Sequence, residues 1–560
     1  MGPGRTSISE RLAAHALALI ALAILVSGCG GSADTAVADP DAPKQHGGLV
    51  TIGMDQEPAC LNEKIQCGSM AATTMIAASL WDGMLDIDAE GNYAPKIATE
   101  VPTKENGAVK DTPDGGMTVT MHVKPEARWS DGKPITCDDV SFRWSTTMDE
   151  RWQVTSRKGW ELIKDVQCPD AQTVVFVWAE RYAPYLGIVS AAPLPKHVLD
   201  GKDFNKYFNE AIPISSGPFL LKKWNRAVDV QLKRNPEYWD KGKDERPWLD
   251  TIRYVFVADT NTLKIQLRTG EVDVISPPPD STLKQELEGF PRGGYQIEPG
   301  IYWEQIAFNN AKAPTNDINV RKAIAYSIDR DQITDVVLKG QVERLDSTLL
   351  PAKKEFYIPA WEHVKYDTKK AAGYLEKSGY ERNGQYFEKG GKPLTVQFKS
   401  TAGNDLRLKV AQLLQQRLKA NGIKMDIALE PPNVFFGQSA PNGAFHMGLW
   451  AWSSGIDPSQ ETMFPCDQIP SEANDFSGQN NYRYCNEKVS DLIAKANVTT
   501  DAAERIVMTH EIQTLMAADM PMLPLFQRPE TLAYTERTLG MDSNPLGGLV
   551  WNAADWAVMK

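Results

Sequence analysis

The sequence contains none of the short motifs that usually carry hydrolytic or nucleotide chemistry. There is no G-x-S-x-G, no H-E-x-x-H, no P-loop and no G-x-G-x-x-G. Histidine is scarce, with seven residues and no ligand-like cluster, and no two cysteines form a C-x-x-C pair. Metal ligation by these side chains is therefore disfavoured. We predict that the protein is not an enzyme and uses neither a cofactor nor a metal.

The chain also lacks an excess of positive charge and a second long apolar run. Lysine and arginine number 60 against 72 acidic residues, and the net charge is −12. Such a protein has no electrostatic reason to bind nucleic acid or an anionic membrane surface. The hydrophobic content of 42% is that of an ordinary folded protein. The 560 residues predict two or more compact units, and we expect a soluble, monomeric body.

The N-terminus has the composition of an export signal. Arg5 and Arg11 precede a nearly unbroken apolar run, Leu12–Val26, which is shorter than the roughly 20 residues that span a bilayer. Small residues and Cys29 follow, a pattern that resembles a bacterial lipobox. The resemblance implies a lipoprotein signal peptide over residues 1–28, lipidation of Cys29, and a mature chain held to a membrane outside the cytoplasm. A plain signal peptide is the alternative.

Residues 29–47 are small and polar and predict a flexible tether. The six cysteines beyond Cys29 are an even number in an exported chain, which predicts disulfides. Sequence alone does not choose among their possible pairings. We expect neighbours in the sequence to pair, which gives Cys60–Cys67, Cys137–Cys168 and Cys466–Cys485.

The most specific stretch is Arg128–Trp144. Its Ser-Asp-Gly-Lys-Pro segment at 130–134 predicts a turn, and Thr136 predicts the cap of a helix with two aspartates in its first turn. Together these residues resemble the signature Trp-Ser-Asp-Gly-x-Pro-Ile/Leu-Thr-Ala-x-Asp-Val. That signature is typical of the family 5 extracellular solute-binding proteins, the peptide and nickel receptors of ABC importers. Cys137 stands where the family usually has alanine.

Shorter matches to this family follow in its order along nearly the whole chain. They are Asp88–Pro95, Ser216–Phe219, Asn235–Trp239, Gly270–Asp273, Val320–Arg330, Tyr366–Ala371 and Gly379–Tyr380. The resemblance implies an α/β, two-lobed, periplasmic-binding-protein-like fold with an extra inserted subdomain and a ligand cleft between the lobes.

The same resemblance implies the domain boundaries. The first lobe comprises residues 48–85, 213–300 and 525–560, the inserted subdomain residues 86–212, and the second lobe residues 301–524. Hinges are expected near Ile301–Trp303 and near Leu523–Pro524.

Local patterns predict several elements directly. Ala77–Leu85 predicts the end of a helix. Asp86–Tyr93 predicts a hairpin rather than a calcium loop, because no acidic residue follows at the distance such a loop needs. Asp329–Gln332 resembles a capping box between two helices. A βαβ unit is predicted from Leu394–Lys399, Asp405–Asn421 and Ile423–Leu429.

The best candidate for ligand contact is Phe445–Pro458, which predicts a buried strand that ends in a Ser- and Gly-rich turn. In the family this strand end lines the cleft, and an aspartate shortly after a tryptophan binds the ligand's α-amino group. Here Trp452 matches the tryptophan, but Ser454 or Gly455 stands at the expected aspartate, and His446 stands where the family often has another. A buried ammonium without a carboxylate costs several kcal/mol. Either another acid holds the amine, or the ligand has no amine there.

The candidate contact residues combine this strand end with positions that face the cleft by family analogy. They are Trp450, Ala451, Trp452, Ser453, Ser454, Gly455, Trp303, Thr73 and Phe526. The three tryptophans suit stacking on sugar faces, and core packing is the alternative for them. Nickel is less favoured, because His446 alone is a poor start for a nickel site.

The resemblance implies a function of capture and delivery. We expect the substrate-binding lipoprotein of an ABC importer, which captures oligopeptides or dipeptides outside the membrane and delivers them to the permease transmembrane subunits. Its partners would be a small solute, the permease and, through Cys29, the lipid membrane. The alternative is a receptor for an oligosaccharide or another non-peptide solute of the same family.

Overall fold

The computed structural model describes residues 44–243, 245–277, 282–290, 293–474 and 476–559. The predicted signal peptide, Cys29 and most of the tether lie outside the described residues. Within those ranges, no helix combines the length and the apolar character that crossing a membrane requires.

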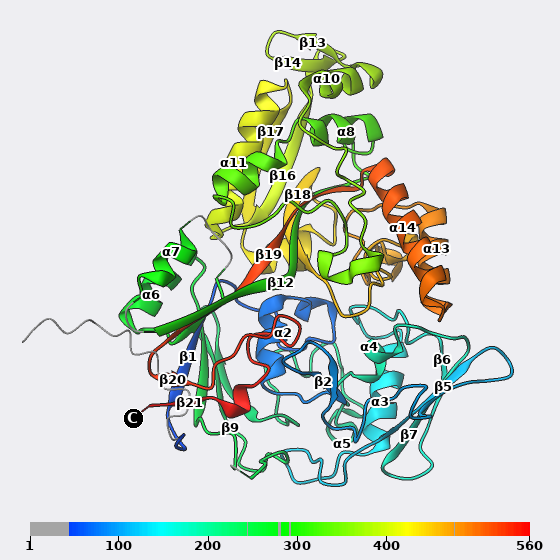
Figure 1. Ribbon diagram of the computed structural model, residues 1–560, viewed down its shortest axis with the longest axis vertical. Coiled ribbons are helices and arrows are strands. Elements are labelled where there is room, and N and C mark those ends of the chain that lie inside the picture. Colours follow the sequence, from blue (N-terminus) through cyan, green and yellow to red (C-terminus); the bar gives the residue numbers. More distant parts are fainter. Residues whose placement is uncertain (1–43, 244, 278–281, 291–292, 475, 560) are drawn as a thin grey trace, which may run out of the picture.

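Among the described residues, a ten-stranded sheet runs through both lobes (Figure 1). Its order is β17-β16-β18-β12-β19-β11-β1-β10-β9-β8. The strands are β1 (Leu49–Met54), β8 (Phe219–Asn225), β9 (Asp229–Arg234), β10 (Thr251–Phe256), β11 (Val274–Ile275), β12 (Gly293–Phe308), β16 (Thr395–Thr401), β17 (Lys424–Glu430), β18 (Met447–Ser453) and β19 (Met522–Thr535).

Strands β12 and β19 connect the two halves of this sheet. They pair antiparallel, and their register shifts between Pro299 and Trp303 and again between Glu304 and Gln305. On one side β19 pairs with β11 of the first lobe, and on the other β12 pairs with β18 of the second lobe. Both strands therefore belong to both lobes. The predicted hinges fall on these strands, and bending there stays a prediction.

The second lobe contains the predicted βαβ unit, which is confirmed. Strands β16 and β17 are parallel, from Thr395 opposite Lys424 to Thr401 opposite Glu430, and α11 (Asp405–Ala420) connects them. Asn404 caps this helix by accepting from the N–H of Arg407. Leu406, Val410, Leu414 and Leu418 are buried along one side of α11, so the helix covers the sheet with its apolar face.

The inserted region forms a separate antiparallel sheet with the order β4-β5-β7-β6. Its strands are β4 (Val109–Asp111), β5 (Met117–His122), β6 (Ile163–Gln167) and β7 (Thr173–Trp178), and α3 (Cys137–Met148) packs beside them. Val119 and Phe176 of this sheet lie in the same buried cluster as Val50 and Ile52 of β1. A second cluster fills the other lobe. The subdomain thus shares its core with the first lobe, and the exact boundaries stay predictions.

The remaining elements cover these sheets or pair in small ones. The helices are α2 (Ala71–Ala78), α4 (Tyr185–Val189), α5 (Lys196–Leu199), α6 (Thr260–Thr269), α7 (Leu283–Glu288), α8 (Ile318–Tyr326), α9 (Arg330–Gln332), α10 (Thr368–Lys377), α12 (Pro432–Val434), α13 (Glu487–Val498) and α14 (Ala502–Asp519). The small sheets comprise β2 (Leu85–Ile87) with β3 (Tyr93–Pro95), β13 (Glu381–Asn383), β14 (Tyr386–Lys389) and β15 (Lys392–Pro393), and β20 (Thr538–Leu539) with β21 (Ala557–Val558).

Most local predictions are confirmed. The hairpin is β2–β3, Thr136 is the N-cap of α3 and donates its N–H to Asp139, and Asp329 caps α9 by accepting from the N–H of Gln332. The predicted disulfides Cys60–Cys67, Cys137–Cys168 and Cys466–Cys485 are all formed.

The predicted helix end over Ala77–Leu85 is wrong. Helix α2 stops at Ala78, and β2 already begins at Leu85. Leu80, Trp81 and Met84 are all buried in the intervening turn. A surface helix would leave one of its faces exposed to solvent. The turn instead buries all three of these apolar side chains, so tertiary packing overrides the local helical pattern.

Candidate ligand-binding site

The end of β18 forms one wall of a cavity between the lobes. Ser453 pairs with Tyr302 of β12, and the N–H of Ser454 donates to the carbonyl of Ile301 at 2.9 Å. Ser453, Ser454, Gly455 and Ile456 then line a cavity of about 380 Å³. Its other lining residues include Trp81, Asp82 and Leu85 of the first lobe, Asp86, Tyr93 and Lys96 at the start of the predicted subdomain, and the C-terminal residues Leu546, Gly547, Val550, Trp551, Ala553 and Ala554. Three predicted contact residues, Ser453–Gly455, are therefore brought to an interlobe cavity.

A second cavity of about 220 Å³ lies beside the first. The two share Ala78, Ile301 and part of the C-terminal segment, so they are neighbouring parts of one cleft. The second cavity is lined by the residues after β1, by α2 and by the crossing of β12 and β19, including Asp55, Thr74, Met75, Ser276, Tyr302, Arg528 and Glu530.

Trp450 and Trp303 lie in the core of the second lobe. Their exposed fractions are 1% and 0%, and the Trp450 ring contacts the rings of Phe435, Phe445 and Tyr482. They line neither cavity. Their predicted contact with a ligand stays a prediction, and their position in this structure is that of core residues.

Trp452 and Ala451 are half-buried between this core and the strand end. The indole N–H of Trp452 donates to the hydroxyl of Tyr482 at 2.7 Å. Thr73 and Phe526 are fully buried, and the Thr73 hydroxyl donates to the carbonyl of Cys60. None of these four lines either cavity, and their role in binding also stays a prediction.

His446 has a structural partner. Its Nδ1 accepts from the N–H of Gln397 at 2.9 Å, which joins the segment before β18 to β16. Burial lowers the pKa of this imidazole, and Lys312 lowers it further. Among the described residues, no group of three or more histidine, cysteine, aspartate or glutamate side chains is placed to hold a metal ion.

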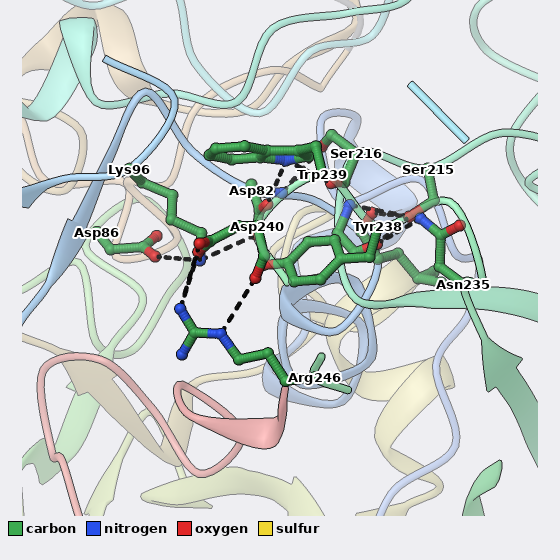
Figure 2. A network of polar contacts seen from close by, with 12 residues as sticks. Asp82, Asp86, Lys96, Ser215, Ser216, Asn235, Tyr238, Trp239, Asp240 and Arg246 are labelled. Carbon is green, nitrogen blue, oxygen red and sulfur yellow. Dashed lines mark hydrogen bonds and ion pairs between the residues drawn. The ribbon is translucent and has the colours of Figure 1, made fainter. Parts of the chain in front are cut away.

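A network of charged side chains surrounds Lys96, which lines the first cavity where the first lobe meets the predicted subdomain (Figure 2). The Lys96 ammonium lies 2.9 Å from Asp240 and 3.8 Å from both Asp82 and Asp86. Arg246 bridges Asp240 and Asp555, at 3.2 Å and 3.1 Å. Of this network, Asp82, Asp86 and Lys96 line the cavity, while Asp240, Arg246 and Asp555 lie behind them and are not among its lining residues.

Asp82 is the most perturbed acid of the network. Its side chain is buried and accepts from the indole N–H of Trp239 at 3.0 Å. Burial raises its pKa to about 7, although Lys96 acts in the opposite direction. Burial also raises the pKa of Asp86. For Asp240 the effect of burial is outweighed by Lys96 and Arg246, so its pKa is lowered.

We expect Asp82→Asn to remove part of the pH dependence of stability. The folded protein holds a proton on Asp82 more tightly than the unfolded chain does, because the folded pKa is about 7 against an ordinary value of 3.8. The stabilising contribution is therefore present at low pH and is lost as pH rises through about 7. Urea unfolding from pH 5 to 8 should show a steeper fall for the wild type than for D82N. The control is Glu271→Gln at an exposed turn, and equal slopes in D82N and wild type would contradict the assignment.

A buried ion pair joins α11 to β12. Arg407 of α11 donates to Glu304 of β12 at 2.8 Å and to the hydroxyl of Thr401 at 2.9 Å. Both charged side chains are nearly inaccessible, with exposed fractions of 4% and 2%. The Arg528 guanidinium approaches Glu304 at 3.8 Å from β19.

Two side-chain contacts join the subdomain to the second lobe, and we call them the rim contacts. Lys158 donates to Asp467 at 2.5 Å, and the Tyr182 hydroxyl donates to Glu461. Glu461 also accepts from the amide of Asn497 at 2.5 Å. Burial raises the pKa of Glu461 to about 7. In this structure the two lobes are therefore in contact away from the crossing strands.

Sequence reasoning missed most of the charged residues of the cleft. Asp55 and Asp82 lie outside any motif, Asp86 and Lys96 lie in or directly after a hairpin that was predicted without a role in binding, and Arg528 lies in a strand whose neighbours are distant in the chain. Only their assembly in three dimensions identifies them.

Comparison with known proteins identifies the family and the fold. Residues 92–469 match the model of "Bacterial extracellular solute-binding proteins, family 5 Middle". The chain is 27% identical over 557 residues to the oligopeptide-binding protein AppA of Bacillus subtilis, which covers 97% of this chain and 98% of AppA.

Solved structures of similar proteins have the same fold. The structure of B. subtilis AppA in complex with a nonapeptide matches with a TM-score of 0.82 and 24% identity, over 92% of this chain and 100% of that one. NikZ of Campylobacter jejuni, in complex with Ni(L-His), matches with a TM-score of 0.78 and 22% identity, over 91% and 99%. The fold is thus that of a two-lobed periplasmic binding protein. The chain belongs to the bacterial extracellular solute-binding proteins of family 5.

Proposed function

We propose that this protein is the substrate-binding lipoprotein of an ABC importer. It captures oligopeptides or dipeptides outside the membrane and delivers them to the permease, and Cys29 anchors it through lipid. The lobes close over the ligand by bending near Ile301–Trp303 and Leu523–Pro524, and the closed monomer is the form that the permease recognises. No bond is made or broken in this cycle.

The observation that carries the proposal is the strand end Ser453–Gly455 at the wall of an interlobe cleft. An open strand end offers main-chain groups to an extended peptide, and such pairing tolerates many side-chain sequences. The two cavities, of about 380 and 220 Å³, are together within the usual range for a small-molecule site. The peptide-binding relatives named above support the same ligand class.

Native mass spectrometry of the purified protein without its predicted signal peptide tests the ligand class. We expect a ladder of mixed peptide masses to accompany the folded protein and to be released on denaturation. A single non-peptide mass, or masses spaced by sugar units, would overturn the peptide assignment in favour of the non-peptide alternative.

A further inference from the structure

The second cavity contains an acid without a partner. Asp55 directly follows β1, and Ser276 directly follows the neighbouring parallel strand β11. Ligands of open α/β sheets bind outside the carboxyl ends of such strands. Within the described part of the chain, the Asp55 carboxylate accepts no hydrogen bond from another residue and has no cation within 4.0 Å.

The same cavity contains an arginine without an acceptor. Arg528 is one-fifth exposed, and in the described ranges its guanidinium makes no hydrogen bond, with a buried Nε that lacks a partner. Its nearest carboxylate is Glu304 at 3.8 Å, which Arg407 already binds. The guanidinium lies 5.7 Å from the centre of the Tyr302 ring. Its terminal Nη groups make no hydrogen bond within the described residues, and the residue lines the cavity, so these groups are the ones that a ligand there would use.

The charges around this cavity favour a cation. Asp55 and Glu530 face it together with Arg528, while Glu304 and Arg407 neutralise one another behind it. The set therefore has one carboxylate in excess. Burial raises the pKa of Asp55, although Arg528 and Arg407 oppose this, and burial likewise raises the pKa of Glu530. A bound ammonium would supply the missing positive charge, whereas a bound carboxylate would add to the excess.

We propose that Asp55 and Arg528 bind the N-terminal residue of the peptide. Asp55 accepts from the α-ammonium, and Arg528 donates to the carbonyl oxygen of the same residue. A free peptide N-terminus presents these two groups a few bonds apart, so one residue satisfies both. The assignment rests on the proposed function and deepens it, because the α-ammonium is then bound by the first lobe rather than by the end of β18. It accounts for the absence of an acid at Ser454 and Gly455.

The test is competition between peptides that differ only at their ends. Folded protein, freed of endogenous ligand and refolded, is mixed with an equimolar pool of synthetic tri- to nonapeptides, each present in free and N-acetylated form. Native mass spectrometry then counts the retained forms. We expect the wild type to prefer the free amine by about tenfold to hundredfold, as charge-assisted hydrogen bonds do. Asp55→Asn should abolish this preference. Arg528→Gln should weaken retention of both the free and the N-acetylated peptides, while the preference for the free amine remains.

Each other result has a definite meaning. Glu271→Gln, at an exposed turn that lines neither cavity, should behave as wild type, and circular dichroism melting checks that each variant is folded. Retention of free and acetylated peptides in equal amounts, or an unchanged preference in D55N, would overturn this assignment alone. Retention of no peptide by folded wild type would overturn the proposed function as well. A second pool compares the same peptides with free and amidated C-termini. A preference for free acids that R528Q loses would overturn the assignment of Arg528 and place it at the C-terminal end of the peptide.

Discussion

Replacing Arg407 by methionine is expected to lower the free energy of unfolding by about 3–5 kcal/mol. The substitution leaves the Glu304 carboxylate buried without its closest cation, 2.8 Å away, and also removes the donor to Thr401. Desolvation of an unpaired charge is much more costly than the loss of an exposed ion pair. Urea unfolding followed by tryptophan fluorescence measures the change.

A matched control lies on the same helix. Lys409 and Asp405 form an ion pair at 2.6 Å on the exposed side of α11, and Lys409→Met should cost less than about 1 kcal/mol. The double variant Glu304→Met with Arg407→Met should recover much of the stability that R407M loses, because neither charge then remains buried alone. If R407M is no less stable than K409M, the buried pair does not hold α11 on the crossing strands.

Replacing Trp450 by alanine is expected to lower the free energy of unfolding by about 3–5 kcal/mol. Its ring is 1% exposed and packs among Phe435, Phe445 and Tyr482, so truncation leaves a cavity in the second lobe. Peptide retention by the fraction that remains folded should be little changed. Unfolding free energy and peptide retention must both be measured, because the sequence also suggests that this ring stacks on the ligand.

Trp551 provides the comparison, because it lines the first cavity and is only half-buried. Trp551→Ala should reduce ligand retention while it costs much less stability than W450A. If W450A instead keeps its stability and loses peptide retention, the Trp450 ring contacts the ligand rather than fills the core.

Elements formed by neighbours in the chain could be predicted from the sequence. The cap at Thr136, the β2–β3 hairpin and the unit β16–α11–β17 each depend on turn chemistry or periodicity within a few dozen residues. The end of α2 was mistaken because the buried run from Leu80 to Met84 packs into a turn that no local pattern specifies. The fold class followed from the family resemblance rather than from periodicity.

The candidate site was only partly predictable, because it assembles residues from distant parts of the chain. Asp55 follows β1 and Arg528 lies on β19, far away in the chain, and β11, which pairs with both strands, brings the two residues to one cavity. For Ser453–Gly455, the local pattern predicts the strand and its Ser- and Gly-rich turn, and the family resemblance alone implies that this turn lines the cleft. The tryptophans beside it were harder to place, since an apolar aromatic residue suits a core and a cleft equally well in sequence.

The rim contacts have a thermodynamic consequence for every ligand alike. Lys158 and Tyr182 of the subdomain contact Asp467 and Glu461 of the second lobe, and none of these four residues belongs to the crossing strands β12 and β19. In the proposed cycle, opening the lobes breaks these contacts, so their free energy is a common offset in each dissociation constant. A substitution there would multiply all affinities by one factor and leave the ranking of ligands unchanged. The overall affinity of the receptor, and with it the lowest solute concentration at which it fills, is thereby set by one part of the molecule. Its selectivity among solutes is set by another.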